Sequence, residues 1–401
     1  MAEQNEKATD LQGLTRLIRD ATIGIVDLVE AMQHRVVHPP FLPTTRVQVL
    51  ITAVASFSYN SIRRGTRFVS GGADRALGGL APLLGNIKSK GDYETLKAIL
   101  NGVFGDHLYH TGNPLEIEMQ FRHGSESLPL NRRDLSERLP DASGKILVMV
   151  HGSCMNDRQW SRKGHNHGAL LAAATGRTPV YLHYNSGLHI SQNGRKFSAL
   201  LERLVSEWPV PVEELCLLTH SMGGLASRSA LYYGREQQAT WPQLLKKMVF
   251  MGTPHHGAPL ERLGNYADQM LSSFHYIKPF ALLGQARSTG VTDMRFGNLT
   301  DEDWLGQDRF ALEKEQRQHI PLPEQTECYA IAAVLGKSSV SRTARIAGDG
   351  LVGVNSALGR HKEPNRNLLF KPENVFVIPK TGHLDLLSSP AVYEKVRVWM
   401  G

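Results

Sequence analysis

The sequence predicts an α/β fold built on a doubly wound, mostly parallel sheet. Short apolar runs alternate with helical stretches from residue 115 to the carboxyl end, as in repeated strand–helix–strand units. The stretch Lys145–Val150 holds five consecutive apolar residues, which is typical of a strand buried on both faces of a parallel sheet. Residues 215–225 read as an apolar strand, a sharp turn at Ser221 and a helix. These three observations predict the fold class.

The first 112 residues are predicted to form a helical region without a catalytic pattern. Apolar residues three and four positions apart form one helix face over residues 11–33, and a second such face over 45–68. The proline-containing stretch 38–43 separates the two helices. A third helix is predicted at about residues 92–108.

Basic residues are concentrated in this N-terminal region. The whole chain has a formal net charge of +7, yet the stretch from Arg35 to Lys90 holds eight Lys and Arg against one acid, Asp74. Such an excess beside amphipathic helices predicts peripheral contact with an anionic membrane surface. The alternative interpretation is that these basic residues form a solvent-exposed helix face with no membrane contact. The sequence has no nucleic-acid-binding motif, so no nucleic-acid partner is expected.

A cytoplasmic protein is expected, with peripheral membrane association as an option. The first seven residues are polar, which disfavours a secretory signal. The most apolar early run, residues 47–62, is too short and too polar for a membrane span. Cys154, Cys216 and Cys328 are far apart and show no metal-binding or redox spacing. Two of them lie in predicted strands, where they are expected to be small buried residues.

Residues 113–401 are predicted to form one α/β domain. Strict alternation over residues 115–121 predicts a half-exposed edge strand. After Lys145–Val150, further strands are expected at residues 180–183, 215–219, 248–251, 329–334 and 375–378. Helices are expected at residues 168–175, 191–208, 222–234 and 391–400. The gap of about residues 259–327 is too long for a plain connection, and its aromatic and apolar residues predict an inserted helical cap.

Ser221 is the first candidate catalytic residue. A serine at a strand-to-helix turn has an exposed hydroxyl, and the next backbone N–H lies at a helix N-terminus, where it stabilises an oxyanion. Thr219 stands in place of the first glycine of the usual G-x-S-x-G pattern. Taken alone, the motif is explained equally well by an ordinary helix N-cap.

A His-Gly pair at residues 151–152 follows the strand Lys145–Val150. Ligands gather at the carboxyl ends of parallel strands, so this loop is expected to face Ser221. The N–H groups of Ser153 and Met222 then form a two-donor oxyanion hole. The alternative interpretation is that the His-Gly pair is an ordinary connection from the strand to the following loop, without a catalytic role.

Two further residues complete a catalytic constellation. Asp349 lies between two glycines, where the chain can turn its carboxylate inward, and His383 follows the last predicted strand. The order Ser221, Asp349, His383 is that of α/β-hydrolases.

At these residues the chain resembles the lipase branch of the α/β-hydrolases, including bacterial lipases and the glycosylphosphatidylinositol inositol-deacylase-like group. The shared motifs are V-H-G at 150–152, H-S-M-G-G at 220–224, G-T-P-H-x-G at 252–257, D-G-L-V at 349–352 and G-H-L-D at 382–385. The resemblance covers about residues 145–400 and implies the α/β-hydrolase fold. It implies these roles: nucleophile Ser221, base His383, orienting acid Asp349, and oxyanion donors Ser153 and Met222.

The resemblance also bears on metals. In bacterial lipases the acid that matches Asp385 helps to hold a calcium ion. No second calcium-binding acid can be placed in this sequence, so neither a metal nor another cofactor is predicted. Residues 252–257 are expected to be a structural turn that borders the pocket.

Together these features predict a serine carboxylic-ester hydrolase of the lipase or esterase type. Its substrate is expected to be a small-molecule or lipid-like acyl ester, cleaved through an acyl-enzyme. A thioesterase or acyltransferase would use the same triad with another leaving group or acceptor. A non-catalytic membrane- or partner-binding protein is less favoured, because all three triad residues are present.

Overall fold

A computed structural model describes residues 9, 10, 12, 13, 15–17, 20, 89–259, 262, 263, 266, 288–307, 317–337 and 342–401. The predicted helix over 45–68, most of the predicted helix over 11–33 and nearly all of the basic stretch lie outside these residues, as does much of the predicted cap. Contacts divide the chain into two units, one of which contains residues 94–107, 117–270 and 287–401. This unit holds the sheet. The expected domain boundary at residue 113 stays a prediction.

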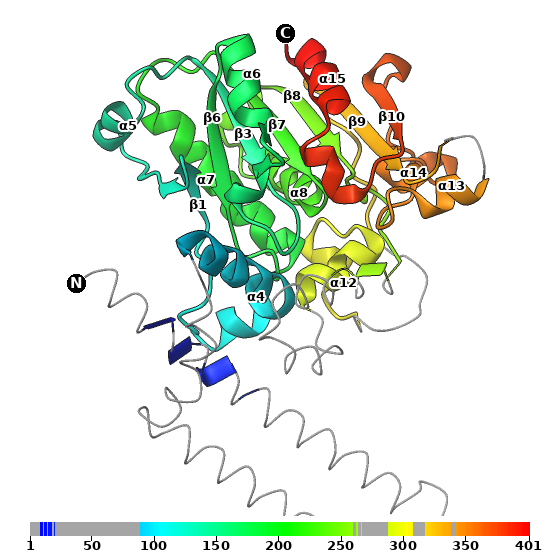
Figure 1. Cartoon of the computed structure of the whole chain (residues 1–401), viewed down its shortest axis with the longest axis horizontal. Helices are drawn as coiled ribbons and strands as arrows, with labels where there is room; N and C mark the ends of the chain where they lie inside the picture. The colour runs from blue at the N-terminus through cyan, green and yellow to red at the C-terminus, as the bar shows by residue number, and fades with distance from the viewer. Residues whose placement is uncertain are drawn as a thin grey trace, which may run out of the picture. The chain divides into compact units, whose positions relative to one another are not determined.

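The sheet has eight strands in the order β10-β9-β8-β7-β3-β6-β1-β2 (Figure 1). Their bounds are β1 Gln120–His123, β2 Glu126–Ser127, β3 Lys145–Val150, β6 Thr178–His183, β7 Glu214–His220, β8 Leu245–Met251, β9 Glu327–Val334 and β10 Val375–Pro379. The six strands from β10 to β6 pair in parallel. Strand β1 is antiparallel to β6 and to β2. The expected mostly parallel sheet is confirmed.

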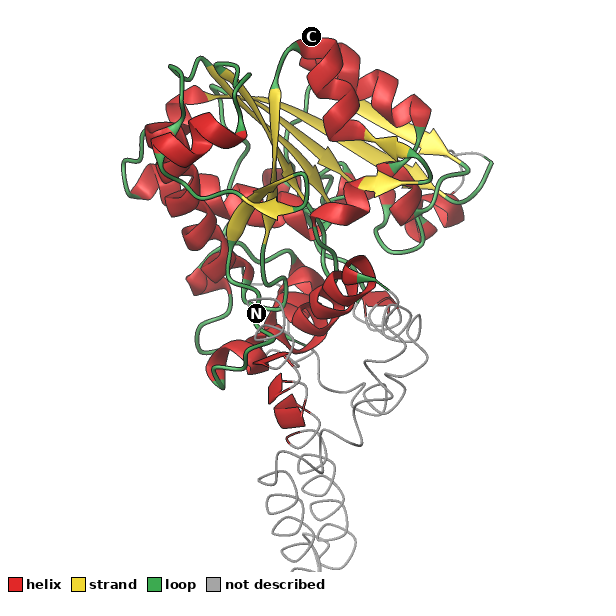
Figure 2. Ribbon diagram, turned by 60° about the vertical axis from the view of Figure 1, so that its left-hand side comes forward, coloured by secondary structure: helices red, strands yellow, loops and turns green. Residues whose placement is uncertain are grey.

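Helices cover both faces of the sheet, as the ribbon view shows (Figure 2). The longer helices of this unit are α6 His167–Thr175, α7 Ile190–Glu207, α8 Met222–Glu236, α12 Thr289–Phe296 and α15 Pro390–Met400. Shorter ones are α5 Arg132–Arg138, α9 Trp241–Leu244, α13 Arg342–Ala347 and α14 Val354–Ala357. Strands β4 Ser161–Arg162 and β5 His165–Asn166 form a separate two-stranded ribbon.

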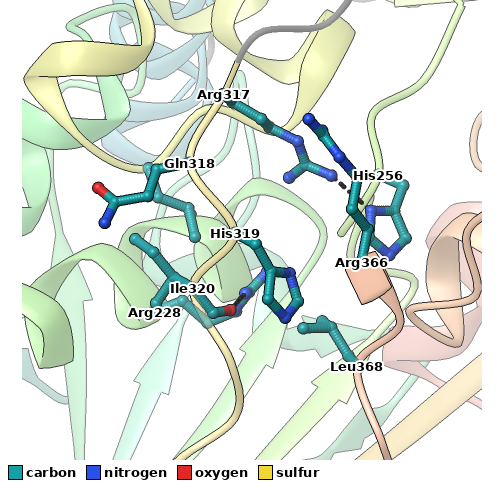
Figure 3. A pocket seen from close by; sticks show the side chains of 9 residues that line it. Arg228, His256, Arg317, Gln318, His319, Ile320, Arg366 and Leu368 are labelled. Carbon is teal, nitrogen blue, oxygen red and sulfur yellow. Dashed lines mark hydrogen bonds between the residues drawn. The ribbon is translucent and has the colours of Figure 1, made fainter. Parts of the chain in front are cut away.

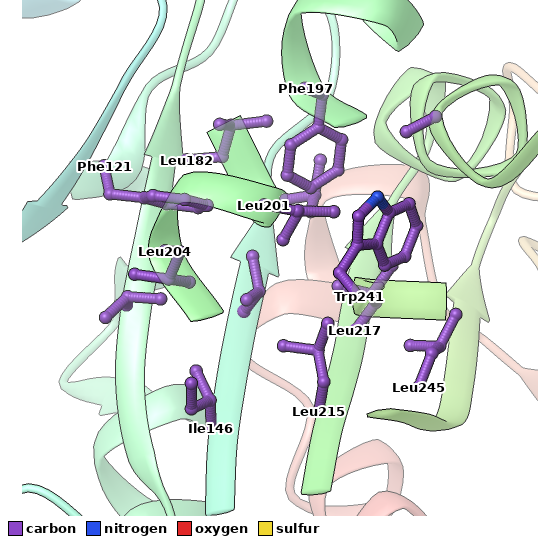
Figure 4. Close-up of a cluster of buried hydrophobic side chains, with 14 of the residues drawn as sticks. Phe121, Ile146, Leu182, Phe197, Leu201, Leu204, Leu215, Leu217, Trp241 and Leu245 are labelled. Atoms are coloured by element: carbon purple, nitrogen blue, oxygen red, sulfur yellow. The ribbon is translucent and has the colours of Figure 1, made fainter. Parts of the chain in front are cut away.

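Strand β3 shows why its residues are apolar without alternation. Ile146, Val148 and Val150 belong to one buried cluster, with Phe197 and Leu201 of α7 and Trp241 of α9 among its other members (Figure 4). Leu147 and Met149 belong to another, with members from α6 and α15. Successive side chains of a strand point to opposite faces. Both faces are therefore buried, which confirms the doubly wound arrangement.

The edge strand is shorter than the alternation of residues 115–121 predicts, because β1 begins only at Gln120. Burial still alternates, since Ile117 and Phe121 are buried and Glu118 is exposed. The difference lies in the backbone hydrogen bonds. The N–H of Ile117 donates to the Asn101 side-chain oxygen at 2.9 Å, so this amide is paired with a side chain and not with a strand.

Other predicted features are also present among the residues that the structure describes. Helix α4 (Lys90–His110) contains the third N-terminal helix expected at residues 92–108. All three cysteines are free and buried, whereas burial was expected for the two in predicted strands. No helix in the described part of the chain is long and apolar enough to cross a membrane.

Only part of the predicted cap belongs to the described residues. There, Val291 and Met294 of α12 lie in a buried cluster with Met222 and Leu225 of α8. This part therefore packs into the core of the domain. That the remainder covers a pocket stays a prediction.

Candidate catalytic site

Ser221 occupies the turn between β7 and α8. Its backbone has φ 54° and ψ −126°, a left-handed region that costs a non-glycine residue on the order of 1–3 kcal/mol. The Ser221 N–H donates to the Met251 carbonyl of β8 at 2.9 Å, which helps to hold this conformation. Its side chain makes no capping hydrogen bond to α8. Ser221 thus stands at the N-cap position of α8 without capping the helix through its side chain.

The loop after β3 lies directly against this turn. A methyl group added at Gly152 would come within 2.9 Å of the Ser221 Cβ. One added at Gly223 would come within 2.5 Å of the His151 carbonyl oxygen. Only residues without a side chain allow this approach. The structure thus brings residues 151–153 beside Ser221, as the sequence predicts.

Asp349 and His383 form a buried pair. The Nδ1 of His383 donates to Oδ2 of Asp349 at 2.7 Å. The other carboxylate oxygen, Oδ1, accepts the N–H groups of Leu351 at 3.0 Å and Val352 at 2.8 Å. Main-chain donors hold the carboxylate on one side, so its second oxygen is presented to the imidazole. This arrangement keeps the proton of neutral His383 on Nδ1 and leaves Nε2 as the basic atom.

The Nε2 atom of His383 is buried and has no hydrogen-bond partner among the described residues. Ser221 and His383 are linked instead through His220, whose Nε2 donates to the His383 carbonyl oxygen at 3.1 Å. The two imidazole centroids are 4.7 Å apart. Burial lowers the pKa of His220 well below its usual value, and the His383 charge lowers it further. His220 is thus a neutral support for the loop that carries His383.

The turn after β8 packs against the Asp349–His383 pair. A methyl group added at Gly252 would lie 3.2 Å from both the Asp349 Oδ2 and the His383 Cε1 atoms. Gly252 also has a positive φ of 61°, which a glycine adopts without strain. The predicted structural turn at residues 252–257 therefore packs directly against the acid–histidine pair.

The two expected oxyanion donors lie at the adjoining backbone segments. Met222 is the first residue of α8. In the loop after β3, the Cys154 N–H donates to the Ser186 hydroxyl at 3.1 Å, which fixes the chain just beyond Ser153. Neither the Ser153 N–H nor the Met222 N–H donates to another described residue. Both remain available to a ligand oxygen.

Asp385, the other acid near His383 in the sequence, is engaged elsewhere. Its Oδ1 forms an ion pair with Lys163 Nζ at 2.8 Å. The hydrogen bond from Lys163 lowers the pKa of Asp385 below its ordinary value. The described residues contain no group of three or more His, Cys, Asp or Glu side chains placed to hold a metal ion.

Tyr266 is a residue at this site that the sequence reasoning missed. Its hydroxyl donates to the Ser153 carbonyl oxygen at 3.3 Å, and its ring lies edge-on to His383 with centroids 6.3 Å apart. Burial raises its pKa, so the phenol stays neutral. No motif marks Tyr266, because it lies in the segment predicted as a cap.

The sheet order, the strained serine turn and the positions of the acid and histidine define an α/β-hydrolase-fold protein. Within it, residues 141–279 match the family model described as the PGAP1-like alpha/beta domain. The predicted resemblance to the α/β-hydrolases is confirmed. Comparison with curated protein sequences gives no match.

Three solved structures illustrate what the chain is similar to. The mature Bacillus licheniformis lipase BlEst2 is 16% identical with a TM-score of 0.42, over 71% of this chain and 98% of that one. A Pyrobaculum calidifontis esterase is 11% identical with a TM-score of 0.37, over 64% and 75%. The RedJ thioesterase from the prodiginine pathway of Streptomyces coelicolor is 12% identical with a TM-score of 0.35, over 65% and 91%.

Proposed function

We propose that this protein is a serine ester hydrolase with Ser221 as the nucleophile, His383 as the general base and Asp349 as the residue that orients His383. The observation that carries the proposal is the 2.7 Å hydrogen bond between His383 and Asp349, beside a serine whose backbone is strained. Strained backbone conformations cluster at functional sites. A buried imidazole nitrogen without a partner is what a general base needs.

The proposed reaction follows from these groups. His383 Nε2 takes the hydroxyl proton as the Ser221 oxygen attacks the ester carbonyl carbon. The imidazolium that forms is stabilised by the ionised Asp349. The N–H groups of Ser153 and Met222 donate to the developing oxyanion, each contributing about 3 kcal/mol in the transition state. The alcohol leaves with the proton from His383, and water then releases the acid from the acyl-enzyme by the same route.

The proposed substrates are small-molecule or lipid-like acyl esters. The experiment that tests this function is a series of p-nitrophenyl esters of increasing chain length, assayed with the full-length wild type and with Ser221→Ala. The proposal expects wild-type turnover that exceeds the variant by several orders of magnitude, because the members of a triad act as a unit. Equal turnover by the two proteins on every ester would refute it.

A further inference from the structure

The peptide unit that joins Gly152 to Ser153 carries the Ser153 N–H, one of the two proposed oxyanion donors. The N–H and C=O groups of a planar trans peptide point in opposite directions. A contact that fixes the Gly152 carbonyl therefore also fixes the direction of the Ser153 N–H. The Gly152 carbonyl oxygen accepts a hydrogen bond from Nδ1 of the His151 side chain at 2.8 Å. A side chain thus orients the peptide that bears the donor.

The His151 ring is itself held in place by Tyr184. Both residues are almost completely buried, and their rings stack with centroids 4.4 Å apart and planes 23° apart. The Tyr184 hydroxyl donates to the His151 carbonyl oxygen at 3.0 Å. Burial raises the pKa of Tyr184, so the hydroxyl keeps its proton. Tyr184 therefore supports both the ring and the main chain of His151.

The protonation state of His151 follows from its contacts. A carbonyl oxygen can only accept a hydrogen bond, so Nδ1 carries the proton. Burial lowers the pKa of His151 to about 4, although the hydrogen bond to Gly152 acts in the opposite direction. The ring is therefore neutral at pH 7, and its Nε2 atom has no hydrogen-bond partner among the described residues. His151 thus has one N–H donor in its side chain, and Gly152 takes it.

The charged groups near His151 do not change this state. Arg122 forms ion pairs with Glu94 at 2.7 Å and with Asp157 at 3.2 Å, and its positive charge favours the neutral form of His151. The ring centroid of His183 lies 6.4 Å from that of His151. Burial lowers the pKa of His183 well below its usual value as well. The surroundings therefore keep His151 as a neutral donor.

The backbone just beyond Ser153 is strained. Cys154 has a φ of 59°, in the left-handed region that is unfavourable for a residue with a side chain. Its N–H donates to the Ser186 hydroxyl at 3.1 Å, and the Ser153 carbonyl oxygen accepts from the Tyr266 hydroxyl at 3.3 Å. These two bonds hold the loop after the donor. Before it lies Gly152, whose backbone is free to rotate because it has no side chain.

The other proposed donor, the Met222 N–H, is fixed in a different way. Met222 is the first residue of α8, so a regular helix holds its main chain. Farther along α8, the buried Arg228 donates to the Ile320 carbonyl oxygen at 2.6 Å and anchors the helix to a neighbouring segment (Figure 3). Ser153 lies in a loop and not in a helix, so its N–H is the donor that depends on a side chain.

We propose that His151 is a positioning residue for the oxyanion hole, because it holds the Gly152 carbonyl and thereby directs the Ser153 N–H toward the oxyanion formed at Ser221. This inference rests on the proposed function. The hydrogen bond is already made in the free enzyme, but the Ser153 N–H stabilises charge that develops only in the transition state. Loss of the contact should therefore lower kcat and leave KM nearly unchanged. A purely structural role would lower the amount of folded protein without changing the kinetics of the folded fraction.

The test compares substitutions of His151 in the full-length protein. Asparagine places its amide nitrogen near the position of Nδ1 and can still donate to Gly152, leucine has no donor, and glutamine places its amide nitrogen one carbon farther out. For a short p-nitrophenyl ester, kcat is expected to fall roughly 10²-fold in His151→Leu and in His151→Gln, with KM changed by less than about twofold. His151→Asn is expected to recover most of this loss. If His151→Leu fails to fold, the polar His151→Gln gives the same comparison.

His123→Leu is the matched control. His123 Nδ1 also donates to a main-chain carbonyl oxygen, that of Pro179 at 3.0 Å, but it lies on β1 in the antiparallel part of the sheet. Titration of each protein with a serine-directed phosphonate counts the active sites, so that kcat refers to folded enzyme. A trifluoromethyl ketone, which forms a tetrahedral adduct with a reactive serine, should lose affinity by roughly the factor by which kcat falls. His123→Leu should change neither quantity.

Wild-type kcat and inhibitor affinity in both His151→Leu and His151→Gln would overturn the proposal. A change confined to KM, or a kcat of His151→Asn as low as that of the other two variants, would overturn it as well. These results differ from a failure of the proposed function. Turnover by Ser221→Ala equal to that of the wild type would show that failure, and this inference would fall with it.

Discussion

His383 Nδ1 lies 2.7 Å from Asp349 Oδ2, and the His383 backbone N–H also donates to the Asp349 carbonyl oxygen at 3.1 Å. The two residues are therefore joined by both side chain and main chain. This double connection fixes the imidazole before any substrate binds. Preorganisation of this kind places a general base at a defined position relative to its nucleophile.

Asp349→Asn is predicted to lower kcat for a short p-nitrophenyl ester by about 10⁴-fold while leaving the fold intact, because the amide favours the wrong imidazole tautomer. Asp385→Asn is the matched control. Its exposed ion pair with Lys163 contributes little to stability, so kcat is expected to stay near the wild-type value. Kinetics and circular dichroism of both variants check this ranking, and the reverse ranking would contradict it.

Gly152→Ala is predicted to reduce activity strongly, because the added methyl group would meet the Ser221 Cβ at 2.9 Å and the His220 Nδ1 at 3.1 Å. A displacement of about 1 Å at a catalytic group can cost about 10²-fold in rate. Gly353→Ala serves as control, since its methyl group would meet only carbonyl oxygens at 3.3 Å or more. Unchanged kcat/KM in Gly152→Ala would show that the loop after β3 does not constrain Ser221.

The free energy of unfolding is predicted to fall as the pH drops below the ordinary histidine value of 6.5. Burial lowers the pKa of His151, His167 and His256 to about 4. Each is neutral when folded and takes up a proton on unfolding. Each therefore contributes stability that is complete above pH 6.5 and is lost as the pH approaches 4, by about 1.4 kcal/mol per pH unit.

Urea unfolding across this range measures the slope. His167 Nε2 donates to the Leu386 carbonyl oxygen at 2.8 Å, so His167→Gln retains a donor but does not titrate. This variant is expected to lose about 1.4 kcal/mol per pH unit of the slope. A stability that is constant between about pH 7 and about pH 5 would refute the account of these buried histidines.

The basic N-terminal stretch lies almost wholly outside the described residues, so its predicted membrane contact rests on the sequence. Eight basic residues against one acid between Arg35 and Lys90 predict co-sedimentation with anionic vesicles. Each basic side chain near the surface contributes about 1 kcal/mol. Binding should weaken in high salt and when Arg63, Arg64 and Arg67 become Gln. Protein that stays in the supernatant at low salt would contradict this prediction.

The parallel strands could be predicted because a strand that is buried on both faces has apolar residues at successive positions. The uninterrupted apolar residues of Lys145–Val150 divide between two buried clusters. The edge strand could not be delimited in this way. Its alternation of burial is real, but the Asn101 side chain takes the backbone N–H of Ile117, and such a pairing depends on the tertiary structure.

The site shows the same division between local and tertiary information. Ser221 and His383 each follow a predicted strand, and the Gly-Asp-Gly turn together with chain order favours Asp349 over Asp385. Tyr266 carries no local pattern.

Labelling with a serine-directed phosphonate, followed by peptide mass spectrometry, tests the central claim most directly. The account predicts one modified residue, Ser221, and loss of ester hydrolysis in proportion to labelling. Asp349→Asn should be labelled far more slowly, because the base that activates the serine is then misoriented. Modification of a serine other than Ser221, or full activity after Ser221 is labelled, would contradict the assignment.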